Sequence, residues 1–386
     1  MTVQMVFVGT YTDPNIQATY TVTPDRPFMG MPGPTGSIGI YAYAQDTVTG
    51  AWSLKYTLPG ANPSFVAIDP GARRLFAVNE ARFTGGEPQG SIVSYELVGH
   101  GELATLLNRQ LSGGGNPCQL SVSPDGETLI VANHEHGRVA VFPIAADGCL
   151  GPATDIQVEE PTDPTGIRGS HSHCVTFDPT GRWVLSMNTG TDRVTVYRFD
   201  QQNKRLISNH RPGVEIPAAG PRHFVFHPTG RFGYTNGEHD MSLSVMAWDG
   251  KKGTMSLIQS IATIPNDISM EEVAANPFGR LRSSHIAIHP NGRLLFVSSR
   301  GYDSIAVFAV DPTSGQVELK RNEPTRGATP RGFAIAPSGR YLYVANQNSA
   351  SVDCFKIDLE TGALVYAGKV AELPAPASIV FAPQAA

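Results

Sequence analysis

The side chains that could do chemistry recur at one kind of position in this chain, just before or just after a short apolar run. His171 and His173 precede one such run, and Arg222-His223 precede the next. Glu238 and Arg300 closely follow later runs. Imidazole and carboxylate groups transfer protons, and a guanidinium binds an anion through parallel hydrogen bonds. These residue types together predict acid–base chemistry on an anionic substrate.

The apolar runs themselves form a repeat. Seven times a short run ends at a turn that contains proline, at positions 70, 124, 179, 228, 290, 337 and 383. A spacing near fifty residues with strand–turn–strand content is typical of a radial β array. We therefore predict an all-β fold, a seven-bladed β-propeller formed as a single domain by residues 1–386.

One repeat shows the expected blade. Residues 174–177 are a predicted first strand, residues 183–187 a second and residues 194–199 a third, and a weaker fourth follows a polar turn near Asn203. The turn that contains Pro179 lies between the first two strands. Proline is compatible with a sheet at such a position because it removes no ladder hydrogen bond there.

The two ends of the chain predict how the ring closes. Residues 6–11 match a second strand and residues 378–383 match a first strand. Pairing of the C-terminal strand with the N-terminal blade would leave no open sheet edge. A Pro/Gly-rich insertion, residues 13–36, interrupts this blade between its second and third strands. A disordered surface loop and a lid or oligomer contact both remain open for it.

Antiparallel pairing predicts where the polar residues gather. The start of a first strand and the end of a second strand lie on the same side of a blade, so polar residues at these positions should line one mouth of the central channel. Propellers commonly bind ligands in such a recess. The polar residues at these positions include His173, Arg222, Glu238 and Arg300, together with the candidate substrate-binding residues His171, His223, Arg282, His285, Asn188, Arg331 and Glu80.

Several of these residues also allow structural interpretations. His171 and His173 share one face of a strand and could hold a metal, but no third ligand stands at matched spacing, so we predict no metal site. Arg222 and Arg300 could instead cap loops or pair with acids. His227 and His289 occupy the turn position on the far side of the disc and are predicted to be turn residues.

Composition excludes several classes of partner. The net charge is −5 without any block of like charges, so no nucleic acid is expected. No apolar run approaches the roughly eighteen residues that cross a bilayer, so no membrane is expected. The four cysteines lack paired spacing, and the N-terminus does not read as a secretory signal, so we expect a cytoplasmic protein. The sequence leaves the oligomeric state open.

Several motifs resemble one known family. The motifs are Gly9-Thr10-Tyr11-Thr12, Asn62-Pro63-Ser64, His171-Ser172-His173, Gly220-Pro221-Arg222-His223, Asn236-Gly237-Glu238 and Ser299-Arg300-Gly301-Tyr302-Asp303-Ser304-Ile305. They resemble the propeller lactonases, which include bacterial cytosolic 6-phosphogluconolactonase and the fungal-type 3-carboxy-cis,cis-muconate lactonizing enzyme. The resemblance implies a site of His173, Arg222, Glu238 and Arg300 without a cofactor. The sequence departs from the family pattern at Asn188, at Asn236-Gly237-Glu238 and at Ser299, near the predicted mouth.

The residues and the resemblance together predict hydrolysis of an anionic sugar or organic-acid lactone, with no redox cofactor. His173 and Glu238 would transfer protons, and Arg222 and Arg300 would bind the anion and stabilise charge on the carbonyl oxygen. No Gly-x-Ser-x-Gly motif supports a serine-esterase route. Three alternatives remain: a cycloisomerase that forms a lactone from a carboxymuconate, a non-catalytic protein-binding propeller, and a calcium-dependent sugar lactonase.

Overall fold

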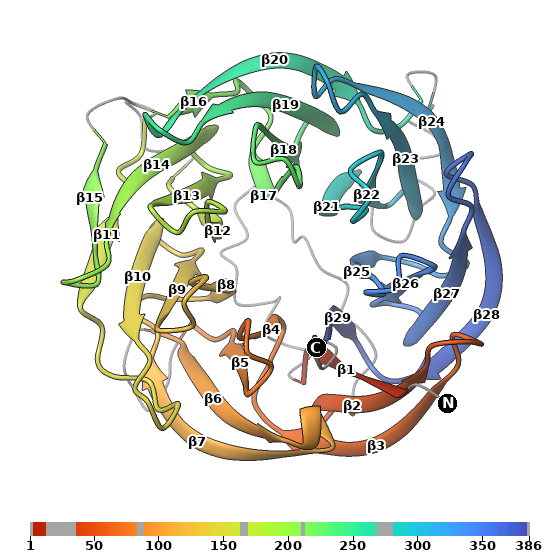
Figure 1. The fold of residues 1–386 in the computed structure, drawn as a ribbon, viewed down its shortest axis with the longest axis horizontal. Coiled ribbons are helices and arrows are strands. Elements are labelled where there is room, and N and C mark those ends of the chain that lie inside the picture. Colours follow the sequence, from red (N-terminus) through yellow and green to blue (C-terminus); the bar gives the residue numbers. More distant parts are fainter. Residues whose placement is uncertain are drawn as a thin grey trace, which may run out of the picture.

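The computed structural model describes residues 3–12, 36–82, 89–162, 169–209, 213–265, 268 and 281–383. Seven antiparallel sheets, the blades, stand in a ring around a central axis (Figure 1). Strands are counted from first to fourth, from the centre of the ring outward. The predicted seven-bladed all-β propeller is confirmed. The predicted insertion, residues 13–36, lies outside the described residues except for Gly36.

The first four blades contain the N-terminal half of the chain and the last strand. Blade one comprises β29 (Pro376–Phe381), β1 (Val3–Thr10), β2 (Gly39–Asp46) and β3 (Trp52–Pro59). Blade two comprises β4 (Val66–Ile68), β5 (Arg74–Asn79), β6 (Ser91–Val98) and β7 (Leu103–Leu111), with the short 3₁₀ helix η2 (Gly99–Gly101) before β7. Blade three comprises β8 (Pro117–Val122), β9 (Thr128–Asn133), β10 (Arg138–Pro143) and β11 (Asp155–Val158). Blade four comprises β12 (Ser172–Phe177), β13 (Trp183–Asn188), β14 (Arg193–Asp200) and β15 (Arg205–Ser208), with β16 (Val214–Glu215) also paired to β14.

The last three blades follow in chain order. Blade five comprises β17 (Pro221–Phe226), β18 (Phe232–Gly237), β19 (Ser242–Asp249) and β20 (Thr254–Ala262). Blade six comprises β21 (Arg282–Ile288), β22 (Leu294–Arg300), β23 (Ser304–Val310) and β24 (Val317–Pro324). Blade seven comprises β25 (Pro330–Ile335), β26 (Tyr341–Asn346), β27 (Ser351–Ile357) and β28 (Leu364–Glu372). No helix in the described part of the chain is long and apolar enough to span a membrane.

The ring closes through the two ends of the chain, as predicted. β29 pairs antiparallel with β1, and Val6 lies opposite Phe381. β1 also pairs with β2, so it is an inner strand of a complete four-stranded blade. From Gln4 onward every residue of β1 is buried. Closure therefore leaves no exposed edge at the junction of the two ends.

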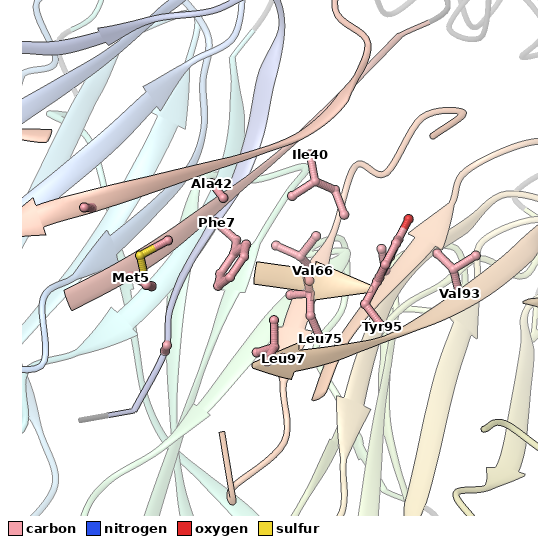
Figure 2. Close-up of a cluster of buried hydrophobic side chains, with 13 residues drawn as sticks. Met5, Phe7, Ile40, Ala42, Val66, Leu75, Val93, Tyr95 and Leu97 are labelled. Atoms are coloured by element: carbon pink, nitrogen blue, oxygen red, sulfur yellow. The ribbon is translucent and has the colours of Figure 1, made fainter. Parts of the chain in front are cut away.

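Apolar contacts between neighbouring blades hold the ring together. Met5 and Phe7 of blade one pack against Val66, Leu75 and Tyr95 of blade two (Figure 2). Comparable clusters occupy the other interfaces between adjacent blades. Inner strands are therefore covered on both faces, which explains why their apolar residues run almost without alternation.

Two histidines tie adjacent blades together at the proline turns. The Nε2 of His227 lies 3.0 Å from the carbonyl oxygen of Gly292, and the Nε2 of His289 lies 2.9 Å from that of Gly339. A carbonyl only accepts, so each Nε2 carries a proton and donates it. Gly292 and Gly339 both have φ of +70°, and a Cβ on Gly339 would lie 2.6 Å from the His289 ring. Both histidines are turn residues, as the sequence predicted.

Replacing His289 by alanine should reduce the free energy of unfolding by about 1–3 kcal/mol, because the Gly339 carbonyl loses its buried donor. His289→Asn is the matched variant: asparagine can keep the local turn, but its side chain is too short to reach the next blade. Urea titration of both variants measures the loss. A midpoint equal to that of the original protein would contradict the assigned interblade bond.

Candidate active site

A β-bulge opens the first strand of several blades and directs one extra side chain toward the central axis. In β12, Ser172 pairs with Asn188 and Cys174 with Met187, so His173 is the extra residue. Bulges redirect side chains in this way and are common beside active sites. The register shifts similarly at the start of β8, β17 and β25. The corresponding residues, each six positions before a turn proline, are Cys118, His173, Arg222 and Arg331.

These four side chains help to line a central cavity of about 410 Å³. Other polar wall residues at this end are Tyr11, Ser64, His223, His285 and Ser378. The rest of the wall is largely apolar and comes from the first strands, for example Val66, Leu120, Phe333 and Ile379. The polar residues predicted at the start of the first strands therefore line one end of this cavity.

Glu238 forms ion pairs with Arg300 and Arg222, which were predicted at the same mouth of the channel. Its Oε1 lies 2.8 Å from Nη2 of Arg300, and its Oε2 lies 3.3 Å from Nε of Arg222. All three residues are buried. Burial alone would raise the pKa of Glu238, but Arg300 and Arg222 outweigh it and hold that pKa well below the usual range. Burial lowers the pKa of Arg300 to about 9, so this ion pair is charged at neutral pH.

Glu238 and Arg300 lie beside the cavity without belonging to its wall, whereas His173 and Arg222 line it. The Nη1 of Arg222 donates to the carbonyl oxygen of Ser284 in the next blade. Glu238 therefore neutralises and orients Arg222 from behind the cavity wall. The structure brings the four predicted catalytic residues together but gives them different access to a ligand.

The imidazole of His173 is buried and lacks a hydrogen bond at one ring nitrogen. It is 6% exposed, and its Nδ1 has no hydrogen-bond partner among the described residues. Burial and the charge of Arg222 lower the pKa of His173 well below 6.5, and Glu238 opposes that shift. His173 is therefore a neutral imidazole at neutral pH. A buried polar atom without a partner is costly unless a ligand or water completes it.

His173 belongs to a row of imidazoles across four blades. The ring of His134 stacks on His171 at a centroid distance of 4.5 Å and lies 5.8 Å from the ring of His173. His173 lies 5.3 Å from His223, which lies 4.9 Å from His285. In the described part of the chain, no group of three or more His, Cys, Asp or Glu side chains is arranged to hold a metal ion.

A second polar group lies across the cavity, on blades one, two and seven. The hydroxyls of Tyr11 and Ser64 both donate to Oε2 of Glu80, the Tyr11 bond being 2.8 Å long. The guanidinium carbon of Arg331 lies 4.9 Å from the Tyr11 ring centre, within range of a cation–π contact. Glu80 is 2% exposed, so it acts from behind Tyr11 and Ser64.

The remaining predicted residues have different surroundings. Arg282 pairs with Arg300 in the β21–β22 register, and its charge acts on Glu238. The Nδ1 of His171 lies 3.1 Å from the carbonyl oxygen of His134. Asn188 lies apart from the cavity wall. Its amide donates to Glu159 and Ser170, and its Oδ1 accepts from three backbone N–H groups of nearby loops, so its contacts are those of a loop-organising residue.

Comparison with known proteins identifies the family. The family model described as lactonase, 7-bladed beta-propeller, matches residues 5–381. This chain belongs to that lactonase family. A protein of Bacillus subtilis named 6-phosphogluconolactonase is 28% identical over 348 residues, 90% of this chain and 95% of the relative. A Pectobacterium atrosepticum protein of the same name is 31% identical over 269 residues, 69% of this chain and 72% of the relative. The structure of a periplasmic gluconolactonase from Pseudomonas aeruginosa is similar, with a TM-score of 0.84, 28% identity and 99% coverage of both chains.

Sequence reasoning missed several cavity residues of this lactonase, among them Tyr11, Ser64 and Cys118. Tyr11 directly follows the second strand of blade one, the position that holds candidate residues in the other blades. Cys118 follows Pro117 just as Arg222 follows Pro221 and Arg331 follows Pro330. Aligning the seven turn prolines and reading six residues back would have found Cys118. Burial raises the pKa of its thiol well above 9, so it is a neutral wall group.

Proposed function

We propose that this lactonase hydrolyses an anionic sugar lactone of the 6-phosphogluconolactone kind. The observation that carries the proposal is His173, a neutral buried imidazole with an unpartnered nitrogen, in the wall of a cavity beside guanidinium groups. The names of the relatives from Bacillus subtilis and Pectobacterium atrosepticum support the same substrate. This activity needs no redox cofactor.

The charge at the mouth favours an anion. The six charged side chains predicted there are the guanidiniums of Arg222, Arg282, Arg300 and Arg331 and the carboxylates of Glu80 and Glu238. This set has two more positive than negative charges. Arg222 and Arg331 line the cavity, so they can donate directly to a substrate phosphate or carboxylate.

His173 supplies the proton transfers in this proposal. Its neutral imidazole accepts a proton from water as the water oxygen attacks the lactone carbonyl carbon. The carbonyl π electrons move onto the oxygen, and a guanidinium stabilises that negative charge. When the ring C–O bond breaks, the imidazolium returns the proton to the departing alkoxide, which leaves an open-chain hydroxy acid. One group thus acts first as base and then as acid.

Glu238 assists this cycle electrostatically. Its carboxylate favours the charged form of His173, because it acts on that pKa in the direction opposite to burial. Glu238 also fixes Arg222 through the 3.3 Å ion pair. Arg300 completes the arrangement by holding the second oxygen of Glu238. We therefore assign proton transfer to His173 and a positioning role to Glu238 and Arg300.

The direct test is hydrolysis of 6-phosphogluconolactone, with the released acid followed by a coupled dehydrogenase and corrected for spontaneous opening. Unphosphorylated gluconolactone is the neutral comparison. A parallel incubation with 3-carboxy-cis,cis-muconate, followed by its ultraviolet absorbance, tests the cycloisomerase alternative. Turnover of the muconate without enzyme-dependent hydrolysis of either lactone would overturn the proposed function.

Replacing Arg331 by glutamine should raise the KM for 6-phosphogluconolactone about tenfold, because a charge-assisted hydrogen bond to the phosphate is lost. The KM for neutral gluconolactone should change far less. Arg340→Gln is the matched control on the same blade, since Arg340 is exposed at the opposite end of the blade. Equal changes in KM for the charged and neutral lactones would show that Arg331 does not recognise the anion.

A further inference from the structure

Arg222, His223 and His285 form a chain of hydrogen bonds along the cavity wall. The Nη1 of Arg222 lies 3.1 Å from Nε2 of His223. The Nδ1 of His223 lies 2.8 Å from Nδ1 of His285 in the next blade. Arg222 is 2% exposed and His223 is 7% exposed, so solvent does not compete strongly for these bonds. All three residues line the cavity.

The chemistry of the groups fixes the direction of each bond. A guanidinium has only N–H donors, so Nε2 of His223 must accept from Arg222. A neutral imidazole has one N–H, so His223 carries its proton on Nδ1 and donates it to Nδ1 of His285. His285 then accepts through Nδ1 and carries its own proton on Nε2.

Both imidazoles are neutral in this environment. Burial and the charge of Arg222 lower the pKa of His285 to about 3, and they hold the pKa of His223 well below 6.5. A proton added to Nε2 of His223 would set an N–H against the Arg222 guanidinium. A proton added to Nδ1 of His285 would set two N–H groups against each other. The geometry and the charges therefore favour the same two tautomers.

A shared metal ion is a poor explanation for the short contact between the two rings. Two imidazole nitrogens bound to one tetrahedral zinc at 2.0–2.1 Å would lie about 3.3 Å apart. The Nδ1 atoms of His223 and His285 lie only 2.8 Å apart, which is a normal hydrogen-bond length. The pair also belongs to no metal-binding group in the described part of the chain.

The Nε2 of His285 has no hydrogen-bond partner among the described residues. The ring is held by its bond to His223 on one side and by an edge-to-face contact with Phe333 at 5.1 Å on another. Both neighbours restrict the ring without using Nε2. A donor held in this way within a cavity wall is available to a ligand.

We propose that Arg222 and His223 lock His285 in its Nε2–H tautomer, so that His285 donates a hydrogen bond to an acceptor oxygen of the bound lactone. His223 is a positioning residue in this arrangement. The tautomer is a property of the protein alone, whereas the role toward a lactone rests on the proposed function. Without the hydrogen bonds from Arg222 through His223, Nε2 of His285 could be either an acceptor or a donor.

Nitrogen NMR of the full-length protein, labelled with ¹⁵N-histidine, tests the proposed tautomers of His223 and His285. At pH 7 we expect an Nε2–H pattern for His285 and an Nδ1–H pattern for His223, and the variants His285→Gln and His223→Gln assign the signals. A proton on Nδ1 of His285, or an imidazolium at either residue, would overturn the proposal. This measurement needs no substrate.

A matched pair of variants tests whether His223 sets the tautomer. The amide of His223→Gln can accept from Arg222 and donate to His285, so it keeps the direction of the chain. His223→Leu can do neither. We expect His285 to keep its Nε2–H signal in the glutamine variant and to show mixed tautomers in the leucine variant. An unchanged His285 signal in a folded leucine variant would remove His223 as the cause, and loss of the Nε2–H signal in the glutamine variant would do the same.

The proposed hydrogen bond from His285 to the lactone is tested by His285→Phe, which keeps a planar ring but lacks the donor. We expect kcat/KM for 6-phosphogluconolactone to fall about fivefold to tenfold, and His285→Gln to recover part of that loss through its amide. If the lactone is hydrolysed and the phenylalanine variant equals the original protein, His285 does not contact the substrate. If no lactone is hydrolysed but the NMR pattern is found, the proposed function fails and the tautomer lock stands.

Discussion

Replacing His173 by alanine should lower kcat for lactone hydrolysis about 10²–10⁴-fold, the usual contribution of a positioned acid–base group. The imidazole is buried in the cavity wall with an unpartnered Nδ1, so alanine removes the proton acceptor of the proposed mechanism. KM should change little, because Arg222 and Arg331 remain in place to hold the anion. Steady-state kinetics with 6-phosphogluconolactone separate the two parameters.

The pH profile gives a second readout of the same residue. The base form of His173 must be neutral to accept a proton, and burial with Arg222 lowers its pKa well below 6.5. Activity should therefore persist at pH values where an ordinary histidine is already protonated, and it should decline only as the pH falls toward the lowered pKa. An acidic limb centred at the ordinary histidine pKa would argue against His173 as the base.

His100→Asn is the control for the loss of an imidazole. His100 is exposed in η2, far from the cavity wall, and its φ of +57° is one that asparagine tolerates well. This variant should keep the kcat of the original protein, and circular dichroism should show an intact fold for both variants. If folded His173→Ala has a kcat within a few-fold of the original protein, His173 does not carry out the proposed proton transfers.

The fold could be predicted because its signals are local and repeated. Each turn proline marks the junction of two apolar strands, and seven such turns with balanced ends require a closed ring. The predicted strands of blade four agree with β12, β13 and β14 to within two residues at each end. Closure could be predicted because residues 6–11 lack a first-strand partner until residues 378–383 supply one.

The sequence could predict which residues lie at the mouth, but not which of them reach the cavity. The ends of the strands place His173, Arg222 and Glu238 on one side of the disc, but the β-bulges decide which of them reaches the cavity. Glu238 stands behind Arg222 because it follows a second strand, whereas Arg222 occupies a bulge in a first strand. Cys118 was not predicted because a neutral thiol resembles an apolar core residue, although its position is equivalent to that of Arg222.

Asn188 shows the other limit of reasoning from position. It ends a second strand, as Asn133 and Asn346 do, and the rule for the mouth applies to all three. Its side chain nevertheless turns to Glu159 and to the backbone N–H groups of its own loop. An asparagine that satisfies loop backbone and one that binds substrate have the same sequence signature, so only the hydrogen bonds separate them. Its predicted role in substrate binding stays a prediction.

Replacing Glu238 by glutamine should destabilise the fold by about 3–5 kcal/mol, the usual cost of removing one partner from a buried ion pair. Two guanidiniums depend on this carboxylate, at 2.8 Å and 3.3 Å, and both side chains are almost fully buried. A neutral amide has one acceptor oxygen in place of two, and it cannot offset either charge. Urea titration at pH 7, read by circular dichroism, measures the loss.

The effect has a definite dependence on pH. The folded-state pKa of Glu238 lies well below its unfolded value of about 4.3, so its contribution is fully present above that value and disappears as the pH falls through the folded pKa. The stability difference between the original protein and Glu238→Gln should therefore be constant near neutral pH and shrink in acid. A difference that grew on acidification would contradict a depressed pKa.

A second substitution distinguishes lost charge pairing from general damage to the site. Adding Arg300→Met to Glu238→Gln removes one of the two guanidiniums that the first change leaves unpaired, and the methionine can fill part of the space. The double variant should therefore be more stable than Glu238→Gln alone, although two changes are usually worse than one. Arg300→Met alone should be destabilising, because it leaves Glu238 with only the longer contact to Arg222. Stability losses that simply add would mean that Glu238 and Arg300 do not act as a pair.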